Sequence, residues 1–125
     1  MKAEAIDTIR YWMDNHPFTV GRVIVQETPD PVWDFEVYLG GVLYGIGVVF
    51  VSNDHIVPRD ALRAMWKAQK LLGVAASVWF CDAALGDVFY VPMHVLEKHR
   101  SDLKPAEDGY DVPVSFLQGI GRCGM

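Results

Sequence analysis

Residues 34–50, DFEVYLGGVLYGIGVVF, decide the fold because they contain two strand patterns separated by a pair of glycines. The runs 34–39 and 42–51 are rich in β-branched and aromatic residues, which is typical of strands. Gly40 and Gly41 between them readily adopt the positive φ angles that a tight hairpin turn needs. Both faces of the second run are apolar, so we expect a central strand that is covered on both sides.

The remainder of the chain alternates between helix and strand patterns. Helix patterns occupy residues 4–14, 59–73 and 92–99, and further strand patterns occupy residues 19–27, 74–83 and 87–91. The longest helix pattern ends at Gly73, a typical stop residue, and carries one apolar stripe, made of Leu62, Met65, Ala68, Leu71 and Leu72. The order αβββαββα predicts an α/β (α+β) fold with a central mixed sheet flanked by helices.

The length of 125 residues corresponds to a single domain, which we place over residues 1–125. We expect its C-terminal part, about 101–125, to be loosely attached. Residues 101–111 are predicted to form a charged loop, residues 112–117 an edge strand or a docked arm, and residues 119–125 a loose tail.

Charge and cysteine content limit the function classes. The formal net charge is −5, so the field of the whole molecule repels nucleic acid, and DNA binding requires a local basic patch. Cys81 and Cys123 make neither a disulfide framework nor a metal-type spacing, which favours a reducing compartment. The longest apolar run, residues 41–51, is too short to span a bilayer. We therefore predict a soluble, cytoplasmic protein with no membrane partner.

The predicted order of elements, with an acid opening the second strand after a proline-containing loop, resembles the core of the PD-(D/E)XK nuclease superfamily. The resemblance covers roughly residues 4–98 and implies a restriction-endonuclease-like fold. In that superfamily an Asp begins the second strand, and an (Asp/Glu)-X-Lys triplet lies on the third. The carboxylates hold Mg²⁺ or Mn²⁺ ions, which activate a water for phosphodiester cleavage, and the lysine orients that water.

The motif is incomplete in this chain. Asp34 matches the first aspartate, but the carboxylate and lysine positions of the third strand carry Gly47 and Val49. Neither side chain binds a metal ion or positions a water. The resemblance therefore implies a degenerate nuclease that does not cleave by the usual mechanism and acts in binding, or as a structural or inhibitory partner. The small size and the nuclease-like fold suggest an origin in a phage or a mobile element.

The alternative is an active Mg²⁺-dependent DNA endonuclease with a rearranged site. Asp34 and Glu36 alternate on one predicted strand, which puts both on one face, roughly 7 Å apart, as candidate metal ligands. Lys67 or Lys70 then replaces the missing lysine, and Gln69 matches a frequent helix position of the superfamily. In the competing interpretation these residues simply form solvated strand and helix faces. A third option is an unrelated α/β subunit of a protein complex.

Four basic residues of the helix 59–73 form what we call the basic stripe, because their spacings of four, four and three place them on one helix face: Arg59, Arg63, Lys67 and Lys70. The stripe is expected to be exposed opposite Leu62, Met65 and Leu72. It either contacts DNA phosphates with salt-sensitive affinity or is the solvated side of an amphipathic helix. A protein partner and a homodimer are the other association states that we consider.

Trp66 lies beside the basic stripe and is the tryptophan expected to face a partner, whereas Trp12, Trp33 and Trp79 are expected in the core.

Overall fold

A computed structural model describes residues 2–15 and 23–122 of the 125-residue chain. Within these residues the main element is a six-stranded sheet in the order β1-β2-β3-β5-β6-β9, in which β3 and β5 are parallel and the other neighbours are antiparallel. Its strands are β1 (Val23–Glu27), β2 (Phe35–Leu39), β3 (Val42–Val51), β5 (Ala75–Cys81), β6 (Asp87–Pro92) and β9 (Gln118–Arg122). The sheet is mixed, as expected. Residues 19–22 of the first predicted strand and Cys123 lie outside the described residues.

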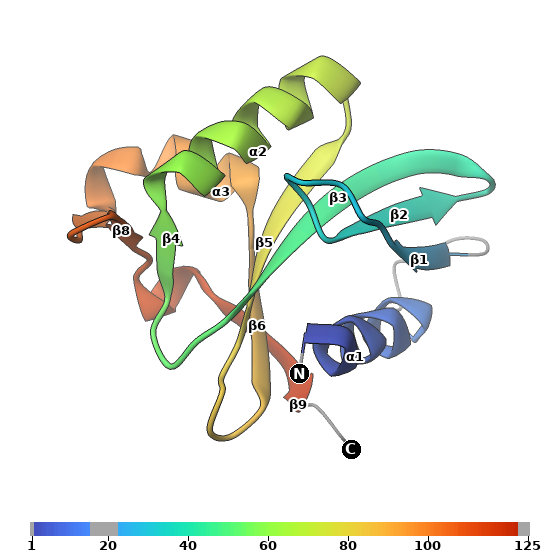
Figure 1. The fold of residues 1–125 in the computed structure, drawn as a ribbon, viewed down its shortest axis with the longest axis horizontal. Coiled ribbons are helices and arrows are strands. Elements are labelled where there is room, and N and C mark those ends of the chain that lie inside the picture. Colours follow the sequence, from blue (N-terminus) through green and yellow to red (C-terminus); the bar gives the residue numbers. More distant parts are fainter. Residues whose placement is uncertain (1, 16–22, 123–125) are drawn as a thin grey trace.

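Helices cover both faces of this sheet. Helix α1 (Lys2–Asp14) lies on one side, and α2 (Arg59–Leu72) and α3 (Met93–Lys98) lie on the other (Figure 1). Helix α2 provides the crossover that the parallel β3–β5 pair requires. None of the helices in the described parts of the chain is long and apolar enough to cross a membrane.

The predicted hairpin is confirmed. Strands β2 and β3 pair in antiparallel register and turn at Gly40 and Gly41, whose φ angles are +60° and +81°. The side chains of β3 alternate between two hydrophobic cores: Ile46 packs with the α2 side, and Val49 packs with the α1 side. The expectation of a central strand covered on both faces is therefore also confirmed.

Helix α2 buries a narrower stripe than the sequence predicts. Met65 and Ala68 are buried, and the helix ends at Gly73, whose φ of +66° lets it cap Gln69 with an N–H···O bond of 2.9 Å. Leu71, however, is 87% exposed. At about 100° per residue, Leu71 lies roughly 120° around the helix from Met65, so it faces solvent.

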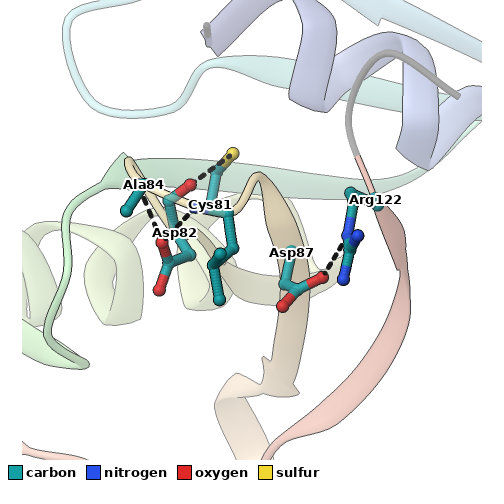
Figure 2. A network of polar contacts seen from close by, with 6 residues as sticks. Cys81, Asp82, Ala84, Asp87 and Arg122 are labelled. Atoms are coloured by element: carbon teal, nitrogen blue, oxygen red, sulfur yellow. Dashed lines mark hydrogen bonds and ion pairs between the residues drawn. The ribbon is translucent and has the colours of Figure 1, made fainter.

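The prediction that the C-terminal part is loosely attached is wrong for residues 101–122. Strand β9 pairs with β6 and forms an edge of the main sheet, and Ile120 packs against the core on the α1 side. Arg122 also forms a 3.0 Å ion pair with Asp87 (Figure 2). The physical reason is that β6 has a free edge, which β9 covers with backbone hydrogen bonds.

The segments before β9 are ordered as well. Short strands β4 (Ile56–Pro58), β8 (Gly109–Asp111) and β7 (Lys104–Pro105) form a second sheet in that order. The segment 112–117, which we predicted to be an edge strand or an arm, contains a single 3₁₀ turn. The remaining elements are the 3₁₀ turns η1 (Arg100–Asp102) and η2 (Val114–Phe116). The short strand β4, which precedes α2, is absent from the order of elements predicted from the sequence.

The turn between β5 and β6 is fixed by one carboxylate. The side chain of Asp82 accepts hydrogen bonds of 2.8 Å from the backbone N–H groups of Ala84 and Leu85 (Figure 2 labels Asp82 and Ala84). Such Asp-centred turns are common because the side chain replaces a missing backbone acceptor. The turn positions β6 between β5 and β9.

Candidate functional site

Asp34, the residue at the superfamily's first metal position, lies directly before β2 and is held from several directions. Its backbone N–H donates to the carbonyl of Gly47 at 2.8 Å, and its carbonyl accepts from Thr28 at 3.1 Å. Its carboxylate accepts a 2.7 Å hydrogen bond from the backbone N–H of Val49 and forms a 3.1 Å ion pair with Lys2 of α1. Both carboxylate oxygens therefore have partners within the protein.

Gly47, at the missing carboxylate position, faces the ring of Phe35. A Cβ atom added at Gly47 would lie 2.2 Å from Cζ of that ring and 2.5 Å and 2.8 Å from its two Cε atoms. The Phe35 side chain is fully buried. The phenyl ring consequently fills the space into which a carboxylate at position 47 would project.

Val49, at the missing lysine position, is 1% exposed and lies opposite Trp79 in the β3–β5 register. Trp79 belongs to a set of four rings on the α1 side of the sheet, which we call the aromatic cluster: Trp12, Phe35, Trp79 and Tyr90. The ring of Trp79 stacks on Tyr90 with 4.7 Å between centroids and meets Phe35 edge to face at 6.0 Å. Burial raises the pKa of the Tyr90 phenol. This face of the hairpin is thus apolar and aromatic.

Glu36 lies on the other face of the sheet, which differs from the predicted arrangement. In β2 it alternates with Phe35 and Val37, which belong to the core on the α1 side. Its carboxylate accepts hydrogen bonds from Tyr38 at 3.1 Å and from the indole of Trp33 at 3.4 Å. The bond from Tyr38 raises the pKa of that phenol.

The difference arises because Asp34 precedes the strand. The rule that alternate residues share a face holds only within a regular strand. The carboxylate of Asp34 instead turns to Lys2 of α1, whereas that of Glu36 lies on the α2 side. The structure therefore does not bring these two predicted ligands together.

The three candidates on α2 also lie across the sheet from the Asp34–Lys2 pair, because α2 packs on the opposite core. The amide oxygen of Gln69 accepts a 3.3 Å hydrogen bond from the backbone N–H of Ala76 and so ties the end of α2 to β5. The ammonium of Lys70 lies 3.8 Å from the centroid of the Trp66 ring, and Lys67 is exposed.

These residues do not fit a Mg²⁺ or Mn²⁺ site of the superfamily type. Asp34 is paired with a lysine, whose positive charge opposes a bound cation, and the two other positions carry no oxygen ligand. Across residues 2–15 and 23–122, no three His, Cys, Asp or Glu side chains are grouped so as to hold a metal ion.

The basic stripe is exposed, as expected, and three of its members border a groove between α2 and α3. Arg59, Arg63 and Lys67 line this α2–α3 groove, and Arg100 of η1 joins them. The volume of the groove is about 410 Å³. Arg100 is absent from the sequence prediction because only the packing of α3 and η1 against α2 brings it to the stripe.

No protein-family model and no curated protein sequence matches this chain. Among solved structures, the fold is similar to that of Hjc, a Holliday junction resolvase from the archaeal hyperthermophile Archaeoglobus fulgidus. The two structures superpose with a TM-score of 0.55 over 78% of each chain, at 12% sequence identity. The mixed α/β fold implied by the sequence resemblance is thereby confirmed: this chain has a fold similar to that of the resolvase.

Proposed function

We propose that this chain is a nuclease-fold domain that binds nucleic acid without cleaving it by the two-carboxylate and lysine mechanism. The observation that carries the proposal is the Phe35 ring, which lies where the second metal-binding carboxylate would project. Asp34 then has a structural role, because its carboxylate joins α1 to β3 through Lys2 and the Val49 N–H. A fold alone does not carry an activity, so the chemistry of the site decides.

Binding of nucleic acid is supported by the distribution of charge. The chain has a net charge of −5, yet Arg59, Arg63, Lys67 and Arg100 gather around one groove, and Glu97 is the one acid among the described residues that line it. A local cluster of this kind attracts a polyanion even when the whole molecule is acidic. Binding through such a cluster releases counterions and therefore weakens as salt increases.

The test combines binding and cleavage. Fluorescence anisotropy with labelled single-stranded, duplex and branched DNA measures affinity at several salt concentrations. Gel electrophoresis of the same DNAs in Mg²⁺ or Mn²⁺ measures cleavage. We expect binding without cleavage, and we expect the double variant Arg63→Glu, Lys67→Glu to flatten the dependence of affinity on salt. Lys98→Glu is the control, because Lys98 is an exposed cation of α3 that does not line the groove.

Cleavage that is lost in Asp34→Asn would overturn the proposal and favour the alternative, an active endonuclease that uses Asp34, Glu36 and Lys67 or Lys70 with Mg²⁺. An unchanged salt dependence of affinity in the charge-reversal variant would show that the basic stripe is not part of the binding site. The inhibitory or structural role, the phage or mobile-element origin, the cytoplasmic location and a homodimeric state stay predictions from the sequence.

A further inference from the structure

The α2–α3 groove is built from three separate parts of the chain. Its basic residues come mainly from α2, and its lining also includes Met93 and Leu96 of α3 and Tyr110 of β8. Figure 1 shows α2, α3 and β8 on the same side of the molecule. The backbone N–H of Arg59 donates to the carbonyl of Asp108 at 2.9 Å, which fixes the start of α2 to the segment that carries Tyr110. The walls of the groove are therefore held in place by the fold.

Trp66 contributes an exposed aromatic surface to this groove. Its side chain is 38% exposed, whereas its neighbour Met65 is buried against the sheet. Lys70, which does not line the groove, lies over the indole with 3.8 Å between its ammonium nitrogen and the ring centroid. This cation–π contact restrains the ring from outside the groove.

Tyr110 provides a second ring, and it too is restrained by a cation. The guanidinium of Arg59 lies 5.7 Å from the centroid of the Tyr110 ring. The groove thus combines two aromatic rings with guanidinium and ammonium groups. Aromatic faces beside cations are the combination that binds single-stranded nucleic acid, because bases stack on the rings while the cations hold the phosphates.

The spacing of the cations suits a polymer with regularly repeated charges. Arg59, Arg63 and Lys67 follow one another every four residues, which is a rise of about 6 Å along the helix for each step. This spacing is comparable to the separation of successive phosphates in an extended single strand. Arg100 of η1 adds a further cation to the lining of the groove.

The exposed side chains of the groove favour a nucleic acid over an acidic helical peptide as its ligand. A peptide helix docks by inserting aliphatic anchors among exposed apolar side chains. Here two of the three aliphatic residues that line the groove are buried, since Met93 is 0% and Leu96 is 2% exposed, and the third, Leu62, is half-buried. The exposed surface of the groove is therefore supplied mainly by rings and charged groups, which a nucleobase and its phosphates match better.

We infer that the α2–α3 groove binds single-stranded nucleic acid and takes one unstacked base against Trp66, while Arg59, Arg63, Lys67 and Arg100 hold the neighbouring phosphates. This inference rests on the proposed function and specifies its ligand. A duplex keeps its base faces stacked inside the helix, so it offers phosphates to the stripe but no base to Trp66. Single strands consequently bind more tightly than duplexes of the same length.

The experiment is an anisotropy titration with a fluorescein-labelled 12-nucleotide oligothymidylate and with a duplex of the same length. We expect the single strand to bind at least tenfold more tightly. Trp66→Ala should weaken single-strand binding by about 5- to 150-fold, the equivalent of losing one stacked base, with the salt dependence unchanged. Trp66→Phe should restore most of the affinity. Tyr44→Ala is the matched control, because Tyr44 is an aromatic residue, 60% exposed, that does not line this groove.

Four results would overturn the inference. Equal affinity for single strand and duplex, or an unchanged affinity in Trp66→Ala, would refute the base-stacking site but leave salt-dependent binding, and hence the proposed function, intact. Tight, Trp66-dependent binding of a labelled acidic amphipathic peptide, without oligonucleotide binding, would assign the groove to a protein partner. Absence of salt-dependent binding to every DNA tested would contradict the proposed function as well.

Discussion

Replacing Gly47 with alanine tests whether the Phe35 ring fills the position of the missing carboxylate. The added methyl carbon would lie 2.2 Å from Cζ of the ring, well inside van der Waals contact. The ring has no open space to enter, because Phe35 is 0% exposed and meets Trp79 edge to face at 6.0 Å. The clash must therefore be relieved by moving packed side chains or the backbone of β3.

The expected loss of stability follows from two opposed effects. Forcing one methyl group into a packed core costs about 1–3 kcal/mol, whereas alanine in a strand gains about 0.5–1 kcal/mol over glycine. We expect a net loss of about 1–2 kcal/mol. With a urea dependence of about 2 kcal/mol per molar, the unfolding midpoint of Gly47→Ala should fall by about 0.5–1 M.

Gly119→Ala is the matched control. Gly119 is also a strand glycine, but an added Cβ there would lie 3.4 Å from Cε1 of Phe89, which is an ordinary contact. Its midpoint should not fall, because the gain of alanine over glycine in a strand is not offset by a clash. The double variant Phe35→Leu, Gly47→Ala should lose less stability than the sum of its two single variants, because the smaller side chain makes room for the methyl group. Equal urea midpoints for Gly47→Ala and Gly119→Ala would refute the claim that the Phe35 ring fills the space beside position 47.

Three further predictions concern the surroundings of this site. Asp34→Ala leaves the N–H of Val49 without its 2.7 Å acceptor and should lower the free energy of unfolding in urea by about 1–3 kcal/mol. Asp34→Asn keeps an acceptor and should lower it less, and equal losses in the two variants would contradict the role of this hydrogen bond. Arg122→Ala removes a partly exposed ion pair with Asp87 and should cost less than about 1 kcal/mol; a larger loss would mean that the pair does more than hold the edge strand. Burial raises the pKa of Tyr90, so the phenol ionises in the unfolded chain, at a pH of about 10, before it ionises in the folded chain. The free energy of unfolding is therefore unaffected by this group below that pH and falls as pH rises above it. Tyr90→Phe should make this alkaline fall shallower, and an identical fall in wild type and variant would contradict the assignment.

The parts of the fold that follow from local chemistry were predictable. Gly40 and Gly41 adopt the positive φ angles that locate the hairpin, and the apolar faces of residues 42–51 identify the central strand. The position of β9 was not predictable. Its glycines have low strand propensity, and its pairing with β6 depends on a sheet edge that only the folded chain creates.

The sequence proposes the positions of a candidate site but does not give their geometry. The sequence identifies Gly47 and Val49 as substitutions, yet the ring that fills the space belongs to Phe35, the cross-strand partner of Gly47. That contact depends on the register of the hairpin, which a shift of one residue would change. The separation of Asp34 from Glu36 depends on where β2 begins, and strand boundaries are the least predictable feature of a sequence.

Calorimetric titration of Mn²⁺ into the wild-type chain and into Asp34→Asn tests whether Asp34 and the residues at positions 47 and 49 can form a metal centre. We expect no saturable binding that depends on Asp34, because its carboxylate is occupied by Lys2 and by the Val49 N–H, and Gly47 and Val49 provide no side-chain ligand. Tight, stoichiometric Mn²⁺ binding by the wild type that disappears in Asp34→Asn would contradict it.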